Sequence, residues 1–233
     1  MSSARNAQRL RPPPVTRLSW EALSGLELGR LALHGPELLA APRGDVPVVV
    51  LPGFRADDYS TLPLRSFLRR LGHEVEGWEL GRNGGNVEAL LPRVEQRVRD
   101  LAARRGEPVA LIGQSLGGVL AREIARDDPK LVARVLTLGT PIVGGPSYTR
   151  VASAYDPREL ERITAAIEDR NRLPIDVPVT AVYSRRDGIV AWQACIDRHN
   201  SHVEHVEVTS SHLGMGLDPR VWMLAARRLA GAA

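Results

Sequence analysis

Short apolar runs alternate with longer amphipathic stretches along most of the chain from residue 46 onward. The runs are rich in Val, Ile and Leu, as strands buried on both faces are, and most stretches between them carry apolar residues at helical spacing. Strands that alternate with helices form a parallel sheet with helices on both faces. The predicted strands are residues 46–51, 74–79, 108–112, 132–138, 177–183 and 203–208. The predicted helices are residues 62–72, 87–105, 116–127, 157–170 and 217–230. We therefore expect an α/β fold on a reduced, mostly parallel sheet of about six strands.

One turn between a predicted strand and a predicted helix carries a chemical motif. Residues 113–117 (Gly-Gln-Ser-Leu-Gly) fit the pattern G-x-S-x-G. In this context the serine occupies a sharp turn with its hydroxyl exposed, and glycines flank it because side chains there would collide with the neighbouring backbone. The N-terminus of the helix adds free N–H groups and a positive dipole end. The sequence therefore predicts that Ser115 is a nucleophile.

A nucleophilic serine needs a base, and the base needs an acid that orients it. Asp187 follows the strand 177–183, and His212 lies in a loop of small residues between the strand 203–208 and the last helix. The carboxyl ends of parallel strands meet at one edge of a sheet, so these two residues and the serine should converge there. The predicted catalytic triad is Ser115, Asp187 and His212.

Two other aspartates compete for the role of the acid. Asp176 precedes its strand and should lie at the opposite edge of the sheet. Asp197 follows Asp187 by ten residues in the same loop region and stays open as an alternative. We expect Asp187 to orient the base, because it comes just past the end of a strand.

At these residues the sequence resembles the α/β-hydrolase superfamily, particularly bacterial esterases and lipases. The resemblance runs from about Val46 to the C-terminal helix and includes residues 138–141 (Leu-Gly-Thr-Pro), similar to a turn of lipase-like members. It also includes residues 51–54 (Leu-Pro-Gly-Phe), where many relatives have His-Gly in place of Pro-Gly. In the family, the loop after the first strand and the residue after the nucleophile each supply one oxyanion-hole N–H. The resemblance therefore implies backbone donors at Phe54 and Leu116, and the change to proline leaves both donors in place.

Two regions depart from the usual pattern of that family. Residues 1–18 are expected to be a flexible tail before a single domain of residues 19–233. A helix from Ser19, its N-cap, to about Leu39 takes the place of the antiparallel strand pair with which many members begin. Residues 142–174 are expected to form a small helical cap where relatives often insert a lid, with residues 144–146 (Gly-Gly-Pro) as its hinge.

Composition narrows the classes of partner. The chain of 233 residues is 43% hydrophobic and 25% charged, and its net charge of +4 comes from arginines interspersed with helical apolar positions. We expect solvated helix faces rather than a nucleic-acid surface. No apolar run is long enough for a transmembrane segment, and no apolar leader follows the N-terminus, so the cytoplasm is the default compartment. The oligomeric state stays open.

Neither metal nor disulfide chemistry is expected. Cys195 is the only cysteine, so no internal disulfide can form. Three histidines recur at every third residue, and such a run entering a strand scatters the rings in different directions: His199, His202 and His205. We expect no metal site and no cofactor.

Side chains near the predicted triad are candidates for substrate binding. Trp192 follows the acid and either lines the acyl or alcohol pocket or packs beside the acid loop. Met215 and Leu213, beside the base, are expected to form part of an apolar wall. Asn83 lies in a glycine-rich loop, residues 78–86, which resembles a W-x-L-G-x-N-x-G stretch of some bacterial hydrolases. Asn83, or Arg82 beside it, either binds substrate or braces the oxyanion loop. The loop is also consistent with a simple turn in which Asn86 caps the next helix.

These observations favour a cofactor-independent serine hydrolase that cleaves carboxylic esters of short to medium acyl chain. A thioesterase or an acyltransferase would use the same triad, and the sequence does not separate these reactions. A non-catalytic binding protein on this scaffold usually lacks at least one member of the triad. An aspartate in place of Ser115 would be needed for haloalkane chemistry, which is therefore excluded. The expected partner is a small ester or lipid-like molecule.

Overall fold

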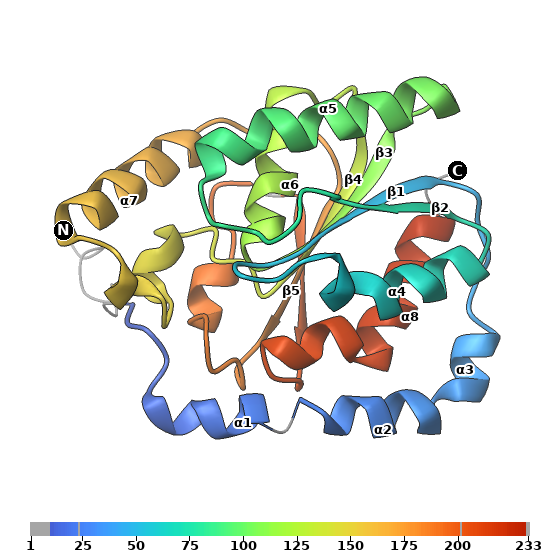
Figure 1. Cartoon of the computed structure of the whole chain (residues 1–233), viewed down its shortest axis with the longest axis horizontal. Helices are drawn as coiled ribbons and strands as arrows, with labels where there is room; N and C mark the ends of the chain where they lie inside the picture. The colour runs from blue at the N-terminus through green and yellow to red at the C-terminus, as the bar shows by residue number, and fades with distance from the viewer. Residues whose placement is uncertain (1–9, 23, 201, 232–233) are drawn as a thin grey trace, which may run out of the picture.

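The computed structural model describes residues 10–22, 24–200 and 202–231, which contain a six-stranded sheet. Its strands lie in the order β2-β1-β3-β4-β5-β6, and every neighbouring pair is parallel (Figure 1). The strands are β1 (Pro47–Leu51), β2 (Glu74–Gly77), β3 (Val109–Gln114), β4 (Val132–Leu138), β5 (Val179–Ser184) and β6 (Val203–Val208). The prediction of a parallel α/β sheet is confirmed, and each predicted strand overlaps an observed one.

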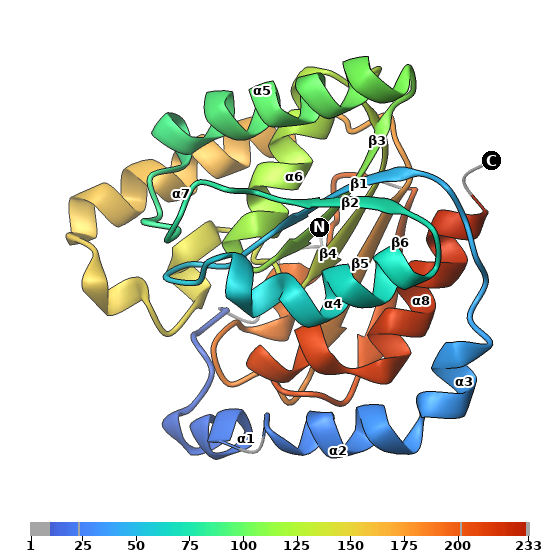
Figure 2. The same ribbon diagram turned by 45° about the vertical axis from the view of Figure 1, so that its right-hand side comes forward.

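Helices cover both faces of the sheet. Helices α4 (Asp58–Arg70) and α8 (Pro219–Ala230) lie on one face, and α5 (Val87–Arg105) and α6 (Leu116–Asp127) lie on the other (Figure 2). Within β1, Val48 and Val50 belong to the core under α4 and α8, whereas Val49 and Leu51 belong to the core under α5 and α6. Burial on both faces explains why the strands are continuous apolar runs rather than alternating ones.

Side-chain caps set the starts of several helices. Asn86 accepts a hydrogen bond from Ala89 N (3.0 Å) at the start of α5, as predicted, and Asp218 caps α8 in the same way. Helix α4 begins four residues before the predicted position, because Asp57 accepts from Tyr59 N (3.0 Å) and thereby starts the helix ahead of Pro63. Within the described ranges, no helix combines the length and the apolar character needed to cross a bilayer.

The N-terminal segment differs from the predicted single helix. It consists of a 3-10 turn, Val15–Arg17, and the short helices α1 (Leu18–Ala22), α2 (Leu26–Leu33) and α3 (Gly35–Leu39). Ser19 is not an N-cap, because it lies inside α1 and its hydroxyl donates to Thr16 O (2.8 Å). Residues 1–9 of the predicted tail lie outside the described residues. The segment runs past the edge of the sheet where the carboxyl ends of the strands meet and then alongside α8 (Figures 1 and 2).

The predicted cap follows β4. It contains two 3-10 turns, Gly145–Tyr148 and Ala152–Ala154, and then helix α7 (Pro157–Asn171). Arg170 near the end of α7 pairs with Glu123 and Asp127 of α6 (both 2.6 Å), so the cap helix is fixed to the body of the fold at this end.

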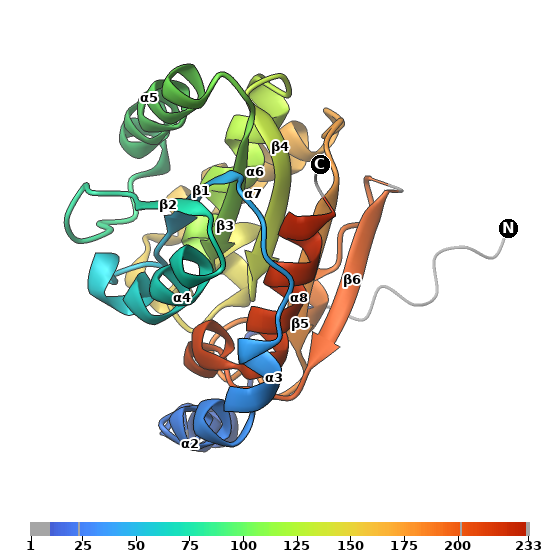
Figure 3. The same cartoon turned by 90° about the vertical axis from the view of Figure 1, so that its right-hand side faces the viewer.

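The two edge strands of the sheet are β2 on one side and β6 on the other (Figure 3).

Candidate active site

Ser115 occupies a strained turn between β3 and α6. Its φ of 51° and ψ of −118° lie outside the regions that residues with a Cβ ordinarily adopt. A Cβ at Gly113 would lie 2.4 Å from the backbone of Gly117 and Gly118, and a Cβ at Gly117 would lie 2.3 Å from Leu51 O. The backbones therefore approach so closely that only glycine fits at these two positions. The resulting turn leaves Ser115 half-buried at the carboxyl end of β3.

The predicted acid and base are joined directly. Asp187 Oδ2 lies 2.7 Å from His212 Nδ1, and both side chains are buried. The other carboxylate oxygen of Asp187 accepts from Ile189 N (2.8 Å) and Val190 N (2.6 Å), which fixes the carboxylate in the loop after β5. A proton on Nδ1 shared with the carboxylate leaves Nε2 of His212 as the basic nitrogen. The arrangement thus holds the imidazole in one orientation and one tautomer.

The turn of Ser115 lies beside this pair. Gln114, the residue before the serine, donates from Nε2 to His212 O (2.9 Å), and Ser115 N donates to Leu138 O (2.8 Å) at the end of β4. A Cβ at Gly139, the next residue, would lie 2.9 Å from His212 Nδ1. The three predicted triad residues therefore meet at one sheet edge, as parallel strands require. Among the described residues, the Ser115 hydroxyl makes no hydrogen bond with His212, a contact that in unliganded enzymes often tightens only when substrate binds.

The surroundings of His212 favour its protonated form. Burial alone lowers the pKa of this imidazole, but the charge and hydrogen bond of Asp187, with the charge of Glu21 added, outweigh burial and raise the pKa above its ordinary value. A general base must be neutral to accept a proton. Reactions that use His212 as a base should therefore gain rate as the pH rises through this elevated pKa.

Asp197, the alternative acid, is engaged elsewhere. Its carboxylate lies 2.5 Å from Arg122 Nη2 and accepts from His199 N (2.8 Å) and Asn200 N (3.0 Å). Burial opposes its ionisation, but the charge of Arg122 and the hydrogen bonds from Arg122, the Asn200 side chain and His199 N outweigh burial and lower the pKa of Asp197. His205 accepts from Asp197 N (2.9 Å). In the part of the chain that the structure describes, no group of three His, Cys, Asp or Glu side chains is placed to hold a metal ion.

The two predicted oxyanion donors flank the nucleophile. A Cβ at Gly53 would lie 3.3 Å from Ser115 Cβ, so the loop that carries Phe54 passes against the serine. Leu116 is the first residue of α6, where backbone N–H groups have no partner within the helix. Over residues 10–22, 24–200 and 202–231, no acceptor bonds to the N–H of Phe54 or Leu116. Both donors are therefore free beside the nucleophile, and their oxyanion role stays a prediction.

Asn83 braces the loop of Phe54. Its side chain is fully buried, donates from Nδ2 to Pro52 O (2.9 Å) and accepts from Gly85 N (3.1 Å). The backbones of Asn83 and Arg55 are also joined (2.8 Å), and Arg82 Nε donates to Arg55 O (2.8 Å). Because its amide is used within the protein, Asn83 fits the bracing alternative and not the substrate-binding role predicted for it.

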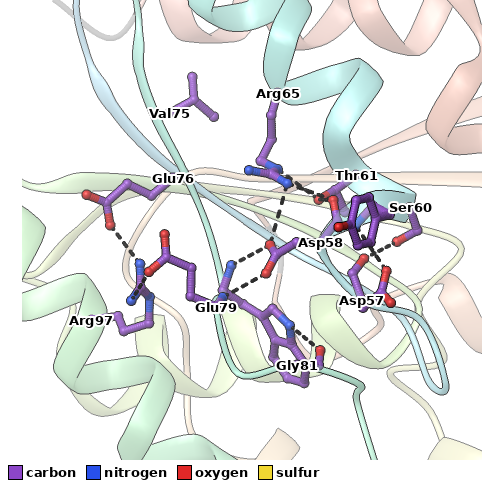
Figure 4. A network of polar contacts seen from close by, with 12 residues as sticks. Asp57, Asp58, Ser60, Thr61, Arg65, Val75, Glu76, Glu79, Gly81 and Arg97 are labelled. Atoms are coloured by element: carbon purple, nitrogen blue, oxygen red, sulfur yellow. Dashed lines mark hydrogen bonds and ion pairs between the residues drawn. The ribbon is translucent and has the colours of Figure 1, made fainter.

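A carboxylate that sequence reasoning missed holds the start of this bracing loop. Asp58, in the first turn of α4, accepts from Trp78 N (3.1 Å) and Glu79 N (3.0 Å) (Figure 4). A Cβ at Gly77 would lie 1.9 Å from Asp58 Oδ1, so the strand end needs glycine for this contact. Arg65 lies on the same carboxylate (3.7 Å). The sequence signal for this role is weak: Asp57 and Asp58 follow the loop of Phe54, and a pair of aspartates at that place indicates only the start of a helix.

The other two predicted substrate contacts lie in packed positions. Trp192 stacks on Tyr183 of β5 (5.7 Å between ring centroids) and lies under the guanidinium of Arg185 (4.5 Å). Met215 is fully buried in the core under α4 and α8, whereas Leu213 beside it is exposed. The apolar wall predicted from Met215 is therefore wrong, because that side chain points into the core. For Trp192 the packing alternative is the one with observed contacts.

Comparison with known proteins identifies structures that share the fold of this chain. Neither the family models nor the curated proteins contain a match to this chain. Among solved structures, it resembles one described with two metagenome-derived lipolytic enzymes, LipS and LipT, at 18% identity and a TM-score of 0.64, over 82% of this chain and 95% of the other. It resembles a monoacylglycerol lipase of Paleococcus ferrophilus at 16% identity and 0.61, over 83% and 96%. It also resembles a thioesterase domain of the curacin biosynthetic pathway at 15% and 0.54, over 80% and 90%. At such identities the shared property is the fold.

We expect Asp187→Asn to lower the pKa of His212, since the substitution removes the charge that outweighs burial. Titration of the histidine ring carbons by NMR measures this directly. In the parent, His212 should titrate above the ordinary value of about 6.5. Asp197→Asn is the matched control: it should destabilise the fold by about 3–5 kcal/mol by leaving Arg122 buried and unpaired, without moving the His212 titration. A shift of His212 in the Asp197 variant alone would make Asp197 the orienting acid.

Gly77→Ala should destabilise the protein by about 1–3 kcal/mol, because the new Cβ would overlap the Asp58 carboxylate that holds the bracing loop. Gly84→Ala, in the same loop, is the control: nothing lies within 4 Å of a Cβ there, so the change should stay within about 0.5 kcal/mol. Urea denaturation of both variants measures the free energies. Equal stabilities would show that the contact between Asp58 and Gly77 does not support the loop.

Proposed function

We propose that this chain, which has the α/β-hydrolase fold, is a serine hydrolase that cleaves carboxylic esters through an acyl-enzyme on Ser115. The observation that carries the proposal is the strained turn of Ser115 beside the hydrogen-bonded pair of Asp187 and His212. A backbone conformation with positive φ at serine is costly, and strain of this kind clusters at functional sites. Each member of the constellation also suits a defined step of acyl transfer.

The proposed reaction begins with proton transfer. His212 Nε2 accepts the hydroxyl proton of Ser115 while the serine oxygen attacks the ester carbonyl. The N–H groups of Phe54 and Leu116 stabilise the negative charge on the carbonyl oxygen of the tetrahedral intermediate. The protonated imidazole then gives its proton to the leaving alcohol. Asp187 stabilises the imidazolium and keeps Nε2 directed at the serine.

Release of the acid repeats the same steps with water. His212 removes a proton from a water molecule, which attacks the acyl-enzyme. The second tetrahedral intermediate then collapses to the carboxylic acid as the protonated His212 returns the proton to the leaving oxygen of Ser115. Nothing in this sequence of steps calls for a cofactor. The predicted cap, residues 142–174, bonds to the loop after Asp187 (Arg150 N to Ile189 O, 2.8 Å), and its small size, a single helix with two short turns, favours acyl chains of short to medium length.

A thioesterase is the second candidate. One of the similar structures is a thioesterase domain, and the triad performs the same acyl transfer on a thioester. An acyltransferase would differ only in the nucleophile that accepts the acyl group from Ser115. A purely binding role is a weaker candidate, because a binding protein has no need of a strained serine or of a buried acid–base pair.

Ser115→Ala should reduce ester turnover by about 10⁴-fold or more, because the hydroxyl forms the covalent intermediate. The protein should stay folded, since the side chain lost is small. A fluorophosphonate probe should label Ser115 in the parent, as read by mass spectrometry of the tryptic peptides. Ser60→Ala, which changes an exposed hydroxyl on α4, is the control and should keep both turnover and labelling. Labelling at another serine would refute the assignment of the nucleophile.

Shortening α7 between residues 159 and 170 should change the chain-length preference more than the chemistry on a small ester. A cap acts through apolar contact with the acyl tail, and each buried methylene is worth about 0.8 kcal/mol. In a series of p-nitrophenyl esters, with acyl-CoA thioesters alongside, the rise of kcat/KM with chain length should flatten while acetate hydrolysis stays within about tenfold. Because the deletion also removes the pairs of Arg170 with α6, thermal stability must be measured in parallel. An equal loss at every chain length would mean that α7 supports the triad instead.

A further inference from the structure

One buried carboxylate joins the acid loop to the histidine loop. Glu21, in α1, accepts with the same oxygen, Oε1, from Gly188 N and from His212 N, both at 2.9 Å. Its second oxygen accepts from Leu213 N, also at 2.9 Å. Gly188 follows the acid of the predicted triad directly, and His212 is its base. A single side chain from the N-terminal segment therefore holds two catalytic loops at a fixed separation.

Gly188 lies closely against the N-terminal segment. A Cβ at Gly188 would lie 2.5 Å from Arg17 O and 3.1 Å from Glu21 Oε1, so a larger residue would push the segment away. Trp20, the neighbour of Glu21, lies under the guanidinium of Arg186 in the acid loop (4.7 Å). This close contact explains why a glycine follows the acid. Arg17, Trp20 and Glu21 of the N-terminal segment each lie against the loop after β5.

The negative charge of Glu21 suggests that this side chain does more than hold the two loops together. Its side chain is 8% exposed, and within the described residues it has no cationic side chain at ion-pair distance. Burying a carboxylate is costly when only backbone N–H groups compensate it, and a neutral amide or hydroxyl could tie two loops together at less cost. The ionised group is an acceptor only, which suits three N–H donors, and it lies next to the imidazole that becomes positive during acyl transfer.

The charged groups around His212 can be named element by element. Asp187 faces the ring from the loop after β5, and Glu21 faces the histidine backbone from α1. Glu27 of α2 packs on Gly214 and pairs with Arg30 instead. Cys195 lies near Asp187 as a neutral thiol, because burial, together with that carboxylate, raises its pKa. The turns of Ser115 and Gly139 add no charge. Glu21 is therefore the second negative charge that acts on the imidazole.

We propose that Glu21 is a positioning residue of the active site, which sets the distance between the acid and histidine loops and stabilises the imidazolium of His212. The N-terminal segment is then part of the catalytic unit and not only a cover for the sheet. This inference rests on the proposed function of Ser115, Asp187 and His212. Glu21 is a positioning residue and not a catalytic one, because both of its carboxylate oxygens accept from backbone N–H groups of the two loops.

Glu21→Gln tests the proposal with little change of shape. The amide oxygen can still accept from Gly188 N and His212 N, but the amide nitrogen meets the N–H of Leu213 as a second donor, and the charge is gone. We expect kcat for an ester to fall about 10- to 100-fold with KM within about threefold, because misplacement by a fraction of an ångström slows proton transfer more than binding. The acid limb of the kcat/KM profile should move to lower pH, since removal of a negative charge lowers the pKa of His212.

Glu27→Gln is the matched control. Glu27 is also a buried glutamate of the N-terminal segment and its stem packs on Gly214, but in the described structure its carboxylate pairs with Arg30 and accepts no hydrogen bond from either loop that Glu21 holds. The Glu27→Gln substitution should leave kcat and the pH profile of kcat/KM unchanged, even if it alters thermal stability. The conservative change Glu21→Asp, which keeps the charge on a shorter stem, should retain the parent acid limb while kcat falls.

Two results would overturn the inference: a Glu21→Gln variant with the pH profile and kcat of the parent, or a loss of activity that tracks thermal stability equally in both glutamine variants. The titration of His212 by NMR, measured without substrate, separates this inference from the proposed function. If the parent neither hydrolyses esters nor reacts with a fluorophosphonate at Ser115, the proposed function fails. In that event a His212 pKa that is lower in Glu21→Gln and unchanged in Glu27→Gln would still support the charge coupling, and equal titrations would refute it.

Discussion

The close passage of α6 against the ends of β1 and β3 is the constraint on which the rest of the site depends. At Gly113 and Gly117 the backbones of helix and strands come so near that any Cβ would overlap main-chain atoms. The chain must therefore turn from strand to helix within one residue, and Ser115 takes the strained conformation. A residue of this kind costs of the order of 1–3 kcal/mol and persists only where its surroundings fix it. The buried sheet and the helix supply that fixation.

Carboxylates that accept backbone N–H groups hold the loops around this turn. Asp58 binds the start of the bracing loop, Asp187 binds its own loop as well as the histidine, and Glu21 binds two loops at once. Loops carry N–H groups without partners in a ladder, and one carboxylate with two oxygens satisfies several of them. Asp58 reaches the loop from α4, which packs on the sheet, Asp187 holds the loop in which it lies, and Glu21 reaches its two loops from the short helix α1. Loops of irregular conformation thereby acquire the rigidity that the proposed acyl transfer requires.

The N-terminal segment consists of short helices that contact the loops of the predicted acid and base. The first strand along the chain is β1, and the described residues before it form short helices that run past the edge where the carboxyl ends of the strands meet and then along α8. A strand pair in this place would extend the sheet sideways, away from the loops of the acid and the base. The helices instead bring Trp20 and Glu21 to those loops. The reduced sheet and the carboxylate behind the histidine are therefore two aspects of one arrangement.

Much of the fold and part of the site could be predicted because the relevant signals are local. The apolar runs, the cap at Asn86 and the glycines around Ser115 each depend on neighbours a few residues away, and the parallel topology then brings Asp187 and His212 to the same edge. Even local signals were ambiguous where two starts compete, as for α4 with Asp57 ahead of Pro63.

What the tertiary structure alone decided are contacts between distant segments. Met215 was predicted to line the substrate site but lies in the core, because the turn after His212 directs its side chain inward. Asn83 was predicted to bind substrate, but its side-chain amide donates to Pro52 O. Glu21 and His212 lie 191 positions apart, and nothing near Glu21 in the chain distinguishes it from a glutamate on a solvated helix. Local patterns set which elements form and where the reacting groups follow strands. The packing of whole elements decides which side chains hold those groups in place, because that choice depends on distances that no short stretch of sequence encodes.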